Sequence, residues 1–481
     1  MGFSGRPSKG CAPCRAKRTK CDLVQPFCTQ CVRKGKVCFG YRNEQDLLFR
    51  NETSLVLRKA KRRNDESGSA SSSSTSSADS LAVLLSVRSP SRRAAVGDEA
   101  IYHFFAHYNE KFFAASGQEN QGGFDYILPV FKQDIISGGP LPEIIKANGL
   151  AALGNVKGAP ELLTAARAAQ SKVLGRLNQQ LQDPKKALSD SSILTCILLA
   201  VFENIICDSP HAAQALTYHL KGAATLAELR GVAQFTSDVG SGIYARMRGF
   251  MLAHCLQTRD PLPSFILHFL QDDEISQRDF EPAFYKLLAR LCQLRAQHKE
   301  KGYVEESMAD EARTLMDEFE AWQPNIAEWK AEERPSLPTD SSMAQSNEAY
   351  RYVWLATTWI FQRTARILAS DLVIEWARAD VLASPSSLAA ATLDDTLRAQ
   401  IELCEELKES TIYYLKTFRD TESAMRTVGG YGLLWPLYVL STASTSTVET
   451  MQWIAVHSEQ IANEFGVRQG KMMADFMKMY I

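Results

Sequence analysis

The chain has 481 residues, of which 45% are hydrophobic and 23% are charged, and its formal net charge at pH 7 is −1. This near-neutral total hides two parts of opposite sign. Residues 1–63 hold 16 basic and 4 acidic residues (+12), whereas the remainder holds 38 basic and 51 acidic residues (−13). Such an asymmetry favours a nucleic-acid-binding arm on a body that DNA would repel. The most apolar run, 193–206, is too short and too polar to span a bilayer, so we expect no membrane role.

Six cysteines open the chain in the pattern C-x2-C-x6-C-x6-C-x2-C-x6-C: Cys11, Cys14, Cys21, Cys28, Cys31 and Cys38. Structural zinc takes four tetrahedral ligands and binds thiolates well. One zinc ion would leave two thiols unused, whereas two ions need eight ligand positions, so two sulfurs must each bridge both metals. The first cysteine of each near-repeat, Cys11 and Cys28, is the natural bridge. We therefore expect two Zn²⁺ per chain.

Each C-x2-C pair is also expected to begin a short helix. Pro13 suits the first turn of a helix over 14–20, and the segment 28–34 forms the matching helix, with Gly35 as its stop. The loop 22–27 contains a proline and would reverse the chain. A module this small has almost no apolar core, so metal binding must supply folding energy, on the order of 10 kcal/mol or more.

The alternative interpretation of these cysteines is a disulfide framework. It is disfavoured because residues 1–5 contain no hydrophobic run of the kind that begins a secretory signal. Metal storage is also disfavoured, since storage would not need the long remainder of the chain. The other five cysteines stand in apolar contexts and are expected to be reduced core residues: Cys196, Cys207, Cys255, Cys292 and Cys404.

The cysteine spacing, the basic run before Cys21 and Asp22 after it resemble the binuclear zinc cluster of fungal transcription regulators. In that family the first helix enters the DNA major groove, usually at a CGG-type triplet. The resemblance implies that Lys17 and Arg18 read bases, while Arg15 and Lys20 contact phosphates. The chemistry agrees, because arginine or lysine pairs with guanine O6 and N7 and flanking cations neutralise phosphates. The alternative is that these residues are merely solvated charges.

Between the cluster and the body we expect two connecting segments. The first, 41–64, includes a short possible helix whose heptads make a poor coiled coil, which leaves the oligomeric state open. It ends in a basic run that consists of Arg58, Lys59, Lys61, Arg62 and Arg63. This run is suited to nuclear import or to extra phosphate contacts, and the alternative is a solvated helix end. The second segment, 65–97, is rich in serine and should be a disordered linker.

From 98 to 481 the sequence predicts a large all-helical domain, so the expected fold class is mainly α. Helical periodicity recurs between glycine and proline breaks, and strand alternation is scarce. Helices are predicted over 98–114, 160–182, 190–206, 211–230, 281–298, 305–322, 346–370, 393–419 and 447–465. The helix that contains 193–206 is expected to be buried in the core.

Two segments of this body, 198–231 and 432–444, resemble the fungal-specific regulatory domain that accompanies such clusters. In the family this domain regulates activity, sometimes by sensing a metabolite or by contacting partners. The acidic segment 305–333 contains Phe319 and Trp322 and could act as an activation surface. The preferred interpretation is that its acidic residues form the solvent-exposed face of ordinary helices.

Candidate catalytic groups in the body are weak. Cys207, Asp208 and His211 lie close together in sequence but are more simply explained as cap, core or surface groups, and His219 as a packed core histidine. Trp354, Trp359 and Phe361 are more typical of packing than of a ligand cage. Known phosphate-binding, nucleophile-elbow and H-E-x-x-H motifs are missing from the sequence, so we expect no enzyme.

The expected function is a nuclear, sequence-specific regulator of RNA polymerase II transcription in a fungus, held in its DNA-reading shape by zinc. Its expected partners are double-stranded DNA and, for the body, co-regulators or a small-molecule effector. The alternative is a zinc-module protein whose body is chiefly a metabolite sensor or partner scaffold, with weak or indirect DNA contact.

Overall fold

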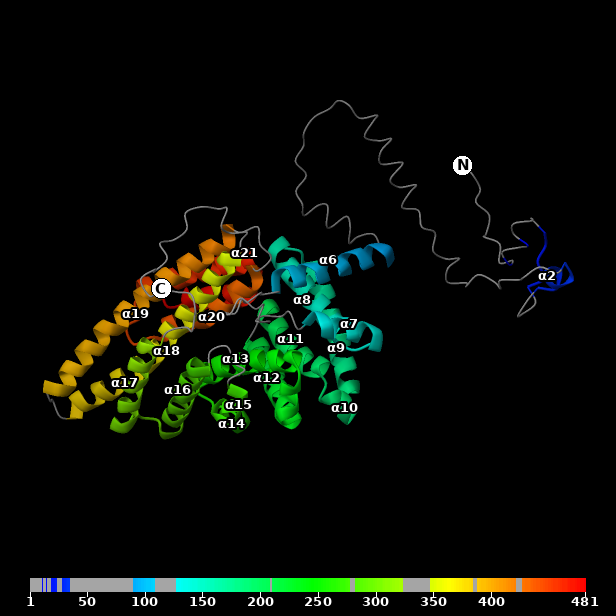
Figure 1. Cartoon of the computed structure of the whole chain (residues 1–481). Coiled ribbons are helices and arrows are strands. Elements are labelled where there is room, and N and C mark those ends of the chain that lie inside the picture. The colour runs from blue at the N-terminus through cyan, green and yellow to red at the C-terminus, as the bar shows by residue number, and fades with distance from the viewer. Residues whose placement is uncertain are drawn as a thin grey trace, which may run out of the picture. The chain divides into compact units, whose positions relative to one another are not determined.

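The computed structural model describes residues 11, 14, 19–23, 28–34, 90–108, 127–207, 210–276, 282–322, 347–383, 387–420 and 426–481. The chain divides into two compact units, Met1–Thr75 and Ser76–Ile481, and each is described by itself. Every regular element among the described residues is helical, which confirms the predicted mainly α fold (Figure 1).

The first unit contributes one short described helix, α2 (Thr29–Arg33), within the cysteine-rich segment. The second unit, the helical body, contains the remaining described helices. They are α6 (Pro90–Tyr108), α7 (Ile127–Ser137), α8 (Leu141–Lys157), α9 (Pro160–Leu181), α10 (Pro184–Ala187), α11 (Asp190–Ile206), α12 (Pro210–Arg230), the 3₁₀ helix η1 (Gly231–Thr236), α13 (Asp238–Thr258), α14 (Ser264–Gln271), α15 (Asp273–Ser276), α16 (Pro282–Lys301), α17 (Glu306–Ala321), α18 (Asn347–Ala383), α19 (Ser387–Asp420), α20 (Arg426–Thr442), α21 (Val448–Phe465) and α22 (Arg468–Met477).

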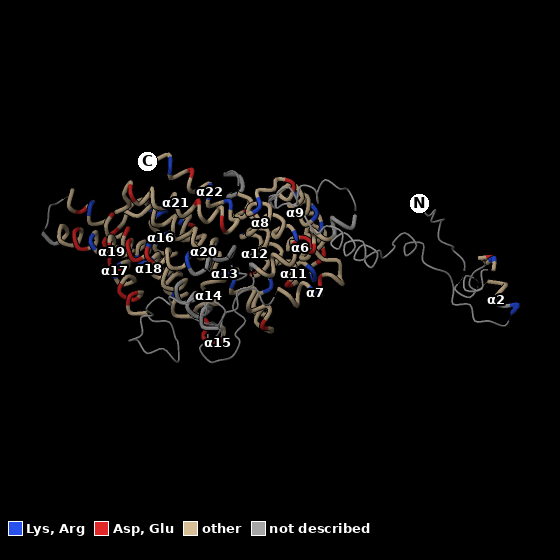
Figure 2. Tube along the Cα trace, turned by 90° about the horizontal axis from the view of Figure 1, so that it is seen from above, with Lys and Arg blue, Asp and Glu red and all other residues tan. Residues whose placement is uncertain are grey.

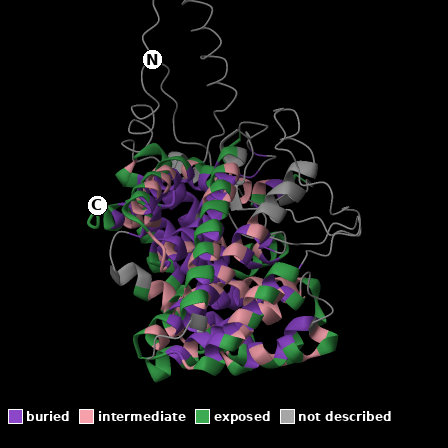
Figure 3. Ribbon diagram, turned by 90° about the vertical axis from the view of Figure 1, so that its left-hand side faces the viewer, coloured by how far each residue is buried: buried purple, intermediate pink, exposed green. Residues whose placement is uncertain are grey.

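Helix α11 lies at the centre of the core, as its apolar sequence predicts. Ser189 caps its start by accepting a hydrogen bond from the Ser192 amide, which satisfies one of the orphan donors of a helix N-terminus. Every residue from 191 to 206 is buried, and the buried residues gather in the interior of the body in Figure 3. A helix that is buried all round needs neighbours on every side, and α8, α9, α12, α13 and α22 supply them.

The most extensive packing joins helices that follow one another in the chain. The pairs are α8 with α9, α11 with α12, α18 with α19, and α21 with α22 (Figure 1). The last helices then return to the first, since α20 packs on α6 and α21 packs on α8. The body is therefore a set of helical hairpins closed by contacts between its two sequence ends.

Most predicted helices are present, with differences at their ends. Helix α6 begins at Pro90, inside the segment 65–97 that was expected to be linker, because proline is well suited to the first position of a helix. Helix α18 continues to Ala383, beyond the predicted end at 370. Its continuation is buried at Leu372, Val373 and Ile374, so tertiary packing extends it.

Helices α6 and α8 cross at a glycine. A Cβ atom on Gly149 would lie 1.9 Å from the carbonyl oxygen of Ala100. Both residues are buried. The two backbones can approach this closely only because residue 149 has no side chain.

Asn155 on α8 links three helices. Its Nδ2 donates to the carbonyl oxygens of Ile205, at 2.7 Å, and of Gly466, at 2.8 Å. Gly466 ends α21 with a φ of 73°, in the left-handed region that favours glycine. A single amide therefore satisfies the ends of α11 and α21 together.

We expect Asn155→Ala to lower the free energy of unfolding of the body by about 2 kcal/mol, because two half-buried carbonyl groups lose their donor. The urea midpoint followed by far-ultraviolet circular dichroism checks this value. Gln460→Ala is the control, since that amide bonds Glu464 at the surface and should change stability by less than about 0.5 kcal/mol. Equal effects of the two changes would contradict the linking role.

The acidic segment that begins at 305 proves to be the outside of a packed helix. Phe319 is fully buried and Trp322 is 9% exposed, and Phe284 contacts both rings. Figure 2 shows many Asp and Glu residues around α17 and α19. The apolar residues of 305–322 thus face the core, as the preferred interpretation requires, whereas 323–333 lies outside the described residues.

Candidate metal centre and nucleic-acid interface

Five of the six amino-terminal cysteines are described, and their sulfurs gather in one cluster. The Sγ atoms of Cys11, Cys14, Cys21 and Cys28 all lie within 4.8 Å of one another. The Sγ of Cys31 lies 3.6 Å from that of Cys11. Four of the five are buried, and Cys21 is half-buried. The cluster brings together residues from both halves of the cysteine repeat.

Cys11 and Cys28 occupy the middle of this cluster. Their sulfurs are 3.5 Å apart, the shortest distance among the described thiols. The Cys11 sulfur also lies 3.7 Å from Cys21 of the first half and 3.6 Å from Cys31 of the second. The Cys28 sulfur lies 3.7 Å from Cys14 and accepts a hydrogen bond from the Cys31 amide. Each central sulfur therefore faces both halves, which is the position that a bridging ligand needs.

The separations fit zinc. A tetrahedral Zn²⁺ with Zn–S bonds of about 2.3 Å holds its sulfurs roughly 3.8 Å apart, and the described sulfurs lie 3.5–3.7 Å from their neighbours. Close packing of several sulfurs disfavours their ionisation to thiolates, and a bound divalent cation would offset this effect. Burial raises the pKa of Cys11 and of Cys28 above the ordinary thiol value. The donor set is thus all sulfur, closely packed and suited to zinc.

Cys21 differs from its neighbours. Burial raises its pKa, but hydrogen bonds from the backbone of Cys11 and Leu23 and from neighbouring thiols outweigh that effect and lower the pKa to about 7. Partial exposure and backbone donors together favour a thiolate at this position.

Local hydrogen bonds position the cysteines. The Thr19 amide donates to the carbonyl oxygen of Cys14, at 2.9 Å, and Thr19 is already outside the helix that includes Cys14. The predicted helix over 14–20 therefore does not include Thr19 or Lys20, and 15–18 lie outside the described residues. The second predicted helix, 28–34, is confirmed as α2 with one residue fewer at each end.

Of the loop between the two halves, the structure describes Asp22 and Leu23, whereas 24–27 lie outside the described residues, so the chain reversal there stays a prediction. Leu23 adopts a positive φ of 61°, a conformation that costs energy for a residue with a side chain. The Oδ2 of Asp22 accepts a hydrogen bond from the Thr29 amide at 3.0 Å. This bond satisfies a donor at the start of α2 and joins Asp22 to that helix. Asp22, noted in the sequence for its resemblance, therefore has a structural role.

The predicted site residues are only partly described. Cys38 lies outside the described residues, as do the base-contact candidates Lys17 and Arg18 and the phosphate-contact candidate Arg15. Lys20 is described and exposed, so its ammonium group is free to meet an anion. The nuclear-import candidates also lie outside the described residues: Arg58, Lys59, Lys61, Arg62 and Arg63.

The five body cysteines form the opposite class of thiol. All are buried, which confirms that they are core residues. Burial raises the pKa of Cys196 and of Cys255 to about 12, and that of Cys404 to about 11. These thiols are therefore protonated at neutral pH and are poor metal ligands.

Among the other body candidates, Asp208 and the side chains of His211 and Trp354 lie outside what the structure describes. Two of the described candidates, Cys207 and Phe361, are packing groups, and His219 differs from them. The Sγ of Cys207 lies 3.8 Å from the Sδ of Met472, and Phe361 packs edge-on against Trp435. His219 is half-buried and its Nε2 lies 3.8 Å from the buried carboxylate of Glu203, so it faces a polar partner instead of packing only among apolar groups.

Comparison with known families gives two matches. Residues 9–47 match the fungal Zn(2)-Cys(6) binuclear cluster domain, and residues 104–466 match the fungal specific transcription factor domain. The first is a domain that binds two zinc ions, which confirms the expected cofactor. Both are domains of transcription regulators that bind DNA.

Individual relatives cover short parts of the chain. It is 31% identical over 112 residues to an uncharacterized protein of Emericella nidulans, a match to 23% of each chain. It is 45% identical over 38 residues, 8% of each chain, to the transcriptional regulatory protein moc3 of Schizosaccharomyces pombe. The chain therefore covers less than a quarter of the length of either relative, and no solved structure matches it.

Among the described residues, none of the helices has the length and apolar character needed to cross a membrane. The sulfur cluster of the first unit and the family match over 104–466 in the second unit indicate the same class of protein. The chain belongs to the family of fungal specific transcription factor domain proteins and carries a Zn(2)-Cys(6) binuclear cluster at its amino-terminal end.

Proposed function

We propose that this protein is a nuclear, sequence-specific regulator of RNA polymerase II transcription that reads CGG-type triplets through a zinc-held basic helix. The observation that carries the proposal is the sulfur cluster. It spans both halves of the repeat at separations suited to zinc, and the interval between Cys14 and Cys21 holds four cations. Clustered cations beside a metal-fixed backbone are suited to phosphate and guanine contacts.

In this proposal the metal ligands are Cys11, Cys14, Cys21, Cys28, Cys31 and Cys38. Cys11 and Cys28 bridge the two ions, which is supported by their central position among the described sulfurs. When bound, zinc supplies the rigidity that a module without an apolar core lacks. The protein's own residues then fix the orientation of the two short helices through the Asp22–Thr29 and Thr19–Cys14 hydrogen bonds.

The DNA contacts follow from the basic interval. Lys17 and Arg18 contact bases, Arg15 and Lys20 contact phosphates, and the basic run from 58 to 63 directs nuclear import. The cluster domain occupies 8–40, followed by the segments 41–64 and 65–97. The helical body, whose first helix begins at Pro90, regulates activity without catalysing a reaction, by contacting co-regulators or a small-molecule effector.

Replacing the base-reading cation tests sequence specificity. We expect Arg18→Ala to weaken binding of the full-length chain to a CGG-containing duplex by about 10- to 100-fold, the value of one bidentate contact to guanine. Binding to a duplex without the triplet should fall much less. Fluorescence anisotropy at several salt concentrations gives both affinities, and elemental analysis should still find two zinc ions per chain.

Lys34→Ala is the matched control, because Lys34 is an exposed cation of the second half and its loss changes the net charge by the same amount. It should weaken binding to both duplexes slightly and equally. If the wild-type chain showed no preference for the CGG duplex, the alternative of a zinc-module protein whose body is chiefly a sensor or scaffold would replace this proposal.

A further inference from the structure

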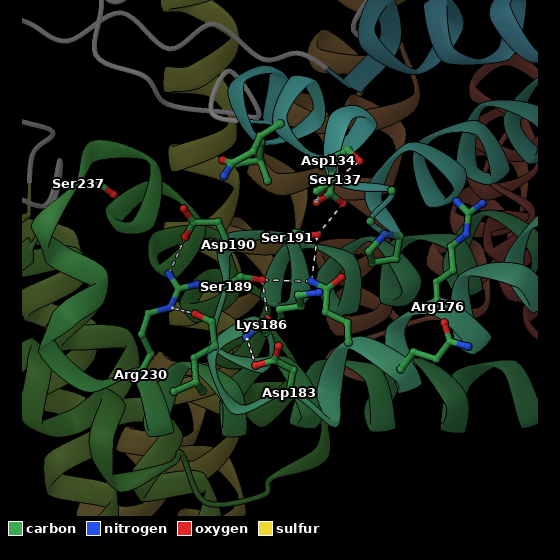
Figure 4. Close-up of a pocket in the computed structure, with 18 of the residues that line it drawn as sticks. Asp134, Ser137, Arg176, Asp183, Lys186, Ser189, Asp190, Ser191, Arg230 and Ser237 are labelled. Atoms are coloured by element: carbon green, nitrogen blue, oxygen red, sulfur yellow. Dashed lines mark hydrogen bonds and ion pairs between the residues drawn. The ribbon is translucent and has the colours of Figure 1, made fainter. Parts of the chain in front are cut away.

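A polar cleft opens on the body where several helices end. Its volume is about 770 Å³, which is within the range typical of small-molecule sites. Helix α7 from Val130 onward and the loop after it form one wall, the carboxyl half of α9 a second, and the start of α11 with the end of α12 a third. Figure 4 shows Arg230 on one side of this space and Arg176 on the other, with Lys186 and Ser189 between them.

The carboxylates of the cleft are already engaged by the protein. The Oδ2 of Asp134 accepts hydrogen bonds from the Leu141 amide at 2.9 Å and from the Ser191 hydroxyl at 2.7 Å. Asp183 caps α10 through the amides that follow it. Asp190 pairs with Arg230, with 2.7 Å between Oδ1 and Nη1. Each negative charge thus has donors of its own.

The donors of the cleft are only partly engaged. Arg230 has a side chain that is 9% exposed, and its Nε donates to the carbonyl oxygen of Leu188 at 2.9 Å. Its Nη2 is buried and has no hydrogen-bond partner among the described residues. A buried donor without an acceptor is costly, so this nitrogen calls for an acceptor that the described residues do not supply.

Further donors face the same space. Arg176 and Lys186 are exposed cations that line the cleft, and neither forms an ion pair within the part of the chain that the structure describes. The cleft also contains the start of α11 and Ser237, the N-cap of α13. The N-cap serines engage one amide of each helix, that of Ser192 and that of Gly240, and the partial positive charge of the two helix ends favours an anion.

We propose that this cleft binds a small organic anion, a compound that carries a carboxylate or a phosphate together with hydroxyl groups. The anionic group meets Arg230, Lys186 and the first turn of α11, while Arg176 contacts the opposite end of the ligand. The hydroxyls of Ser189 and Ser191 already donate to the Lys186 carbonyl oxygen and to Asp134, so these two oxygens accept hydrogen bonds from the hydroxyl groups of the ligand. This inference goes beyond the DNA-reading function proposed above, and it is tested without DNA.

The experiment is a titration of the purified, zinc-loaded full-length chain by isothermal calorimetry. Citrate and inorganic phosphate are used as separate probes, which distinguishes a carboxylate site from a phosphate site. We expect at least one of them to bind saturably at one site per chain, with a dissociation constant of about 1 mM or tighter. The double variant Arg176→Gln/Lys186→Gln should bind at least about tenfold more weakly, since charge-assisted hydrogen bonds are lost.

The double variant should fold normally because both side chains are exposed. Arg230→Gln should abolish binding, and its thermal midpoint shows whether the body remains folded. Lys172→Gln is the matched control: Lys172 lies on α9 four residues before Arg176, is 66% exposed and does not line the cleft. Binding of neither probe below about 10 mM, or an equal loss with Lys172→Gln, would overturn the proposal.

Discussion

Replacing Cys11 or Cys28 with alanine is expected to release both zinc ions, whereas replacing Cys14 should release one. The difference follows from the central positions of the first two sulfurs, each of which faces both halves of the cluster. Removing a bridging thiolate leaves two incomplete sites, while removing a terminal one leaves the second site with four ligands. Elemental analysis of the purified full-length chain should return about zero and about one zinc per chain, respectively.

DNA binding should follow the metal content. We expect no measurable preference for the CGG duplex in either bridging variant, because the module has no other source of rigidity. Cys404→Ala is the control, since that thiol is buried in the body with a pKa raised to about 11 by burial, and it should retain two zinc ions. Equal zinc loss in the Cys11, Cys14 and Cys28 variants would show that no sulfur is shared.

Gly149→Ala is expected to destabilise the body although it adds only one methyl group. Its Cβ would lie 1.9 Å from the Ala100 carbonyl oxygen, so α6 and α8 must move apart. Overpacking of this kind costs about 3 kcal/mol, and the better helix propensity of alanine returns about 1 kcal/mol. The net loss in the free energy of unfolding is therefore about 2 kcal/mol, measured as a lower urea midpoint of the helical signal.

The same substitution elsewhere should have the opposite sign. Gly175 is exposed on α9, and a Cβ there would have no neighbour within 4 Å. Gly175→Ala should therefore raise stability by about 0.5–1 kcal/mol. If Gly149→Ala were also neutral or stabilising, the close crossing of α6 and α8 would be wrong.

Two parts of the molecule could be predicted from the sequence because their physics is local. The cysteine spacing sets how many thiols are available to how many tetrahedral ions, and the five described thiols do gather in one cluster. Helices such as α11 follow from a continuous apolar run with a serine cap. Both signals are contained within short segments, so no knowledge of the distant chain is needed.

Some helices could not be predicted because they contain glycine or proline. Glycine and proline usually interrupt helical periodicity, and for this reason the sequence does not predict the helices over 238–258 and 426–442. In α13, however, a Cβ on Gly240 would lie 2.2 Å from the Gln234 carbonyl oxygen, so this glycine allows η1 to pack closely. In α20, Pro436 lies inside the helix and is tolerated where tertiary packing holds the chain.

The polar cleft could not be predicted, because its residues come from segments that are distant in sequence. Arg230 meets Asp190 across 40 positions, and Ser191 meets Asp134 across 57. Each residue alone has the character of an ordinary cap or surface charge. Only the packing of α7, α9, α11 and α12 brings them to one place, and a single sequence does not report that packing.

The pairing of consecutive helices has a consequence for how the body assembles. Each hairpin buries its apolar faces with little loss of chain entropy, so the early steps of folding should be fast and should proceed during synthesis. The bond from Asn155 to Gly466 spans 311 positions, so α8 keeps an uncovered side until α21 has been made. We therefore expect nascent chains that stop before 448 to be recognised by chaperones, with release following once the closing helices are translated.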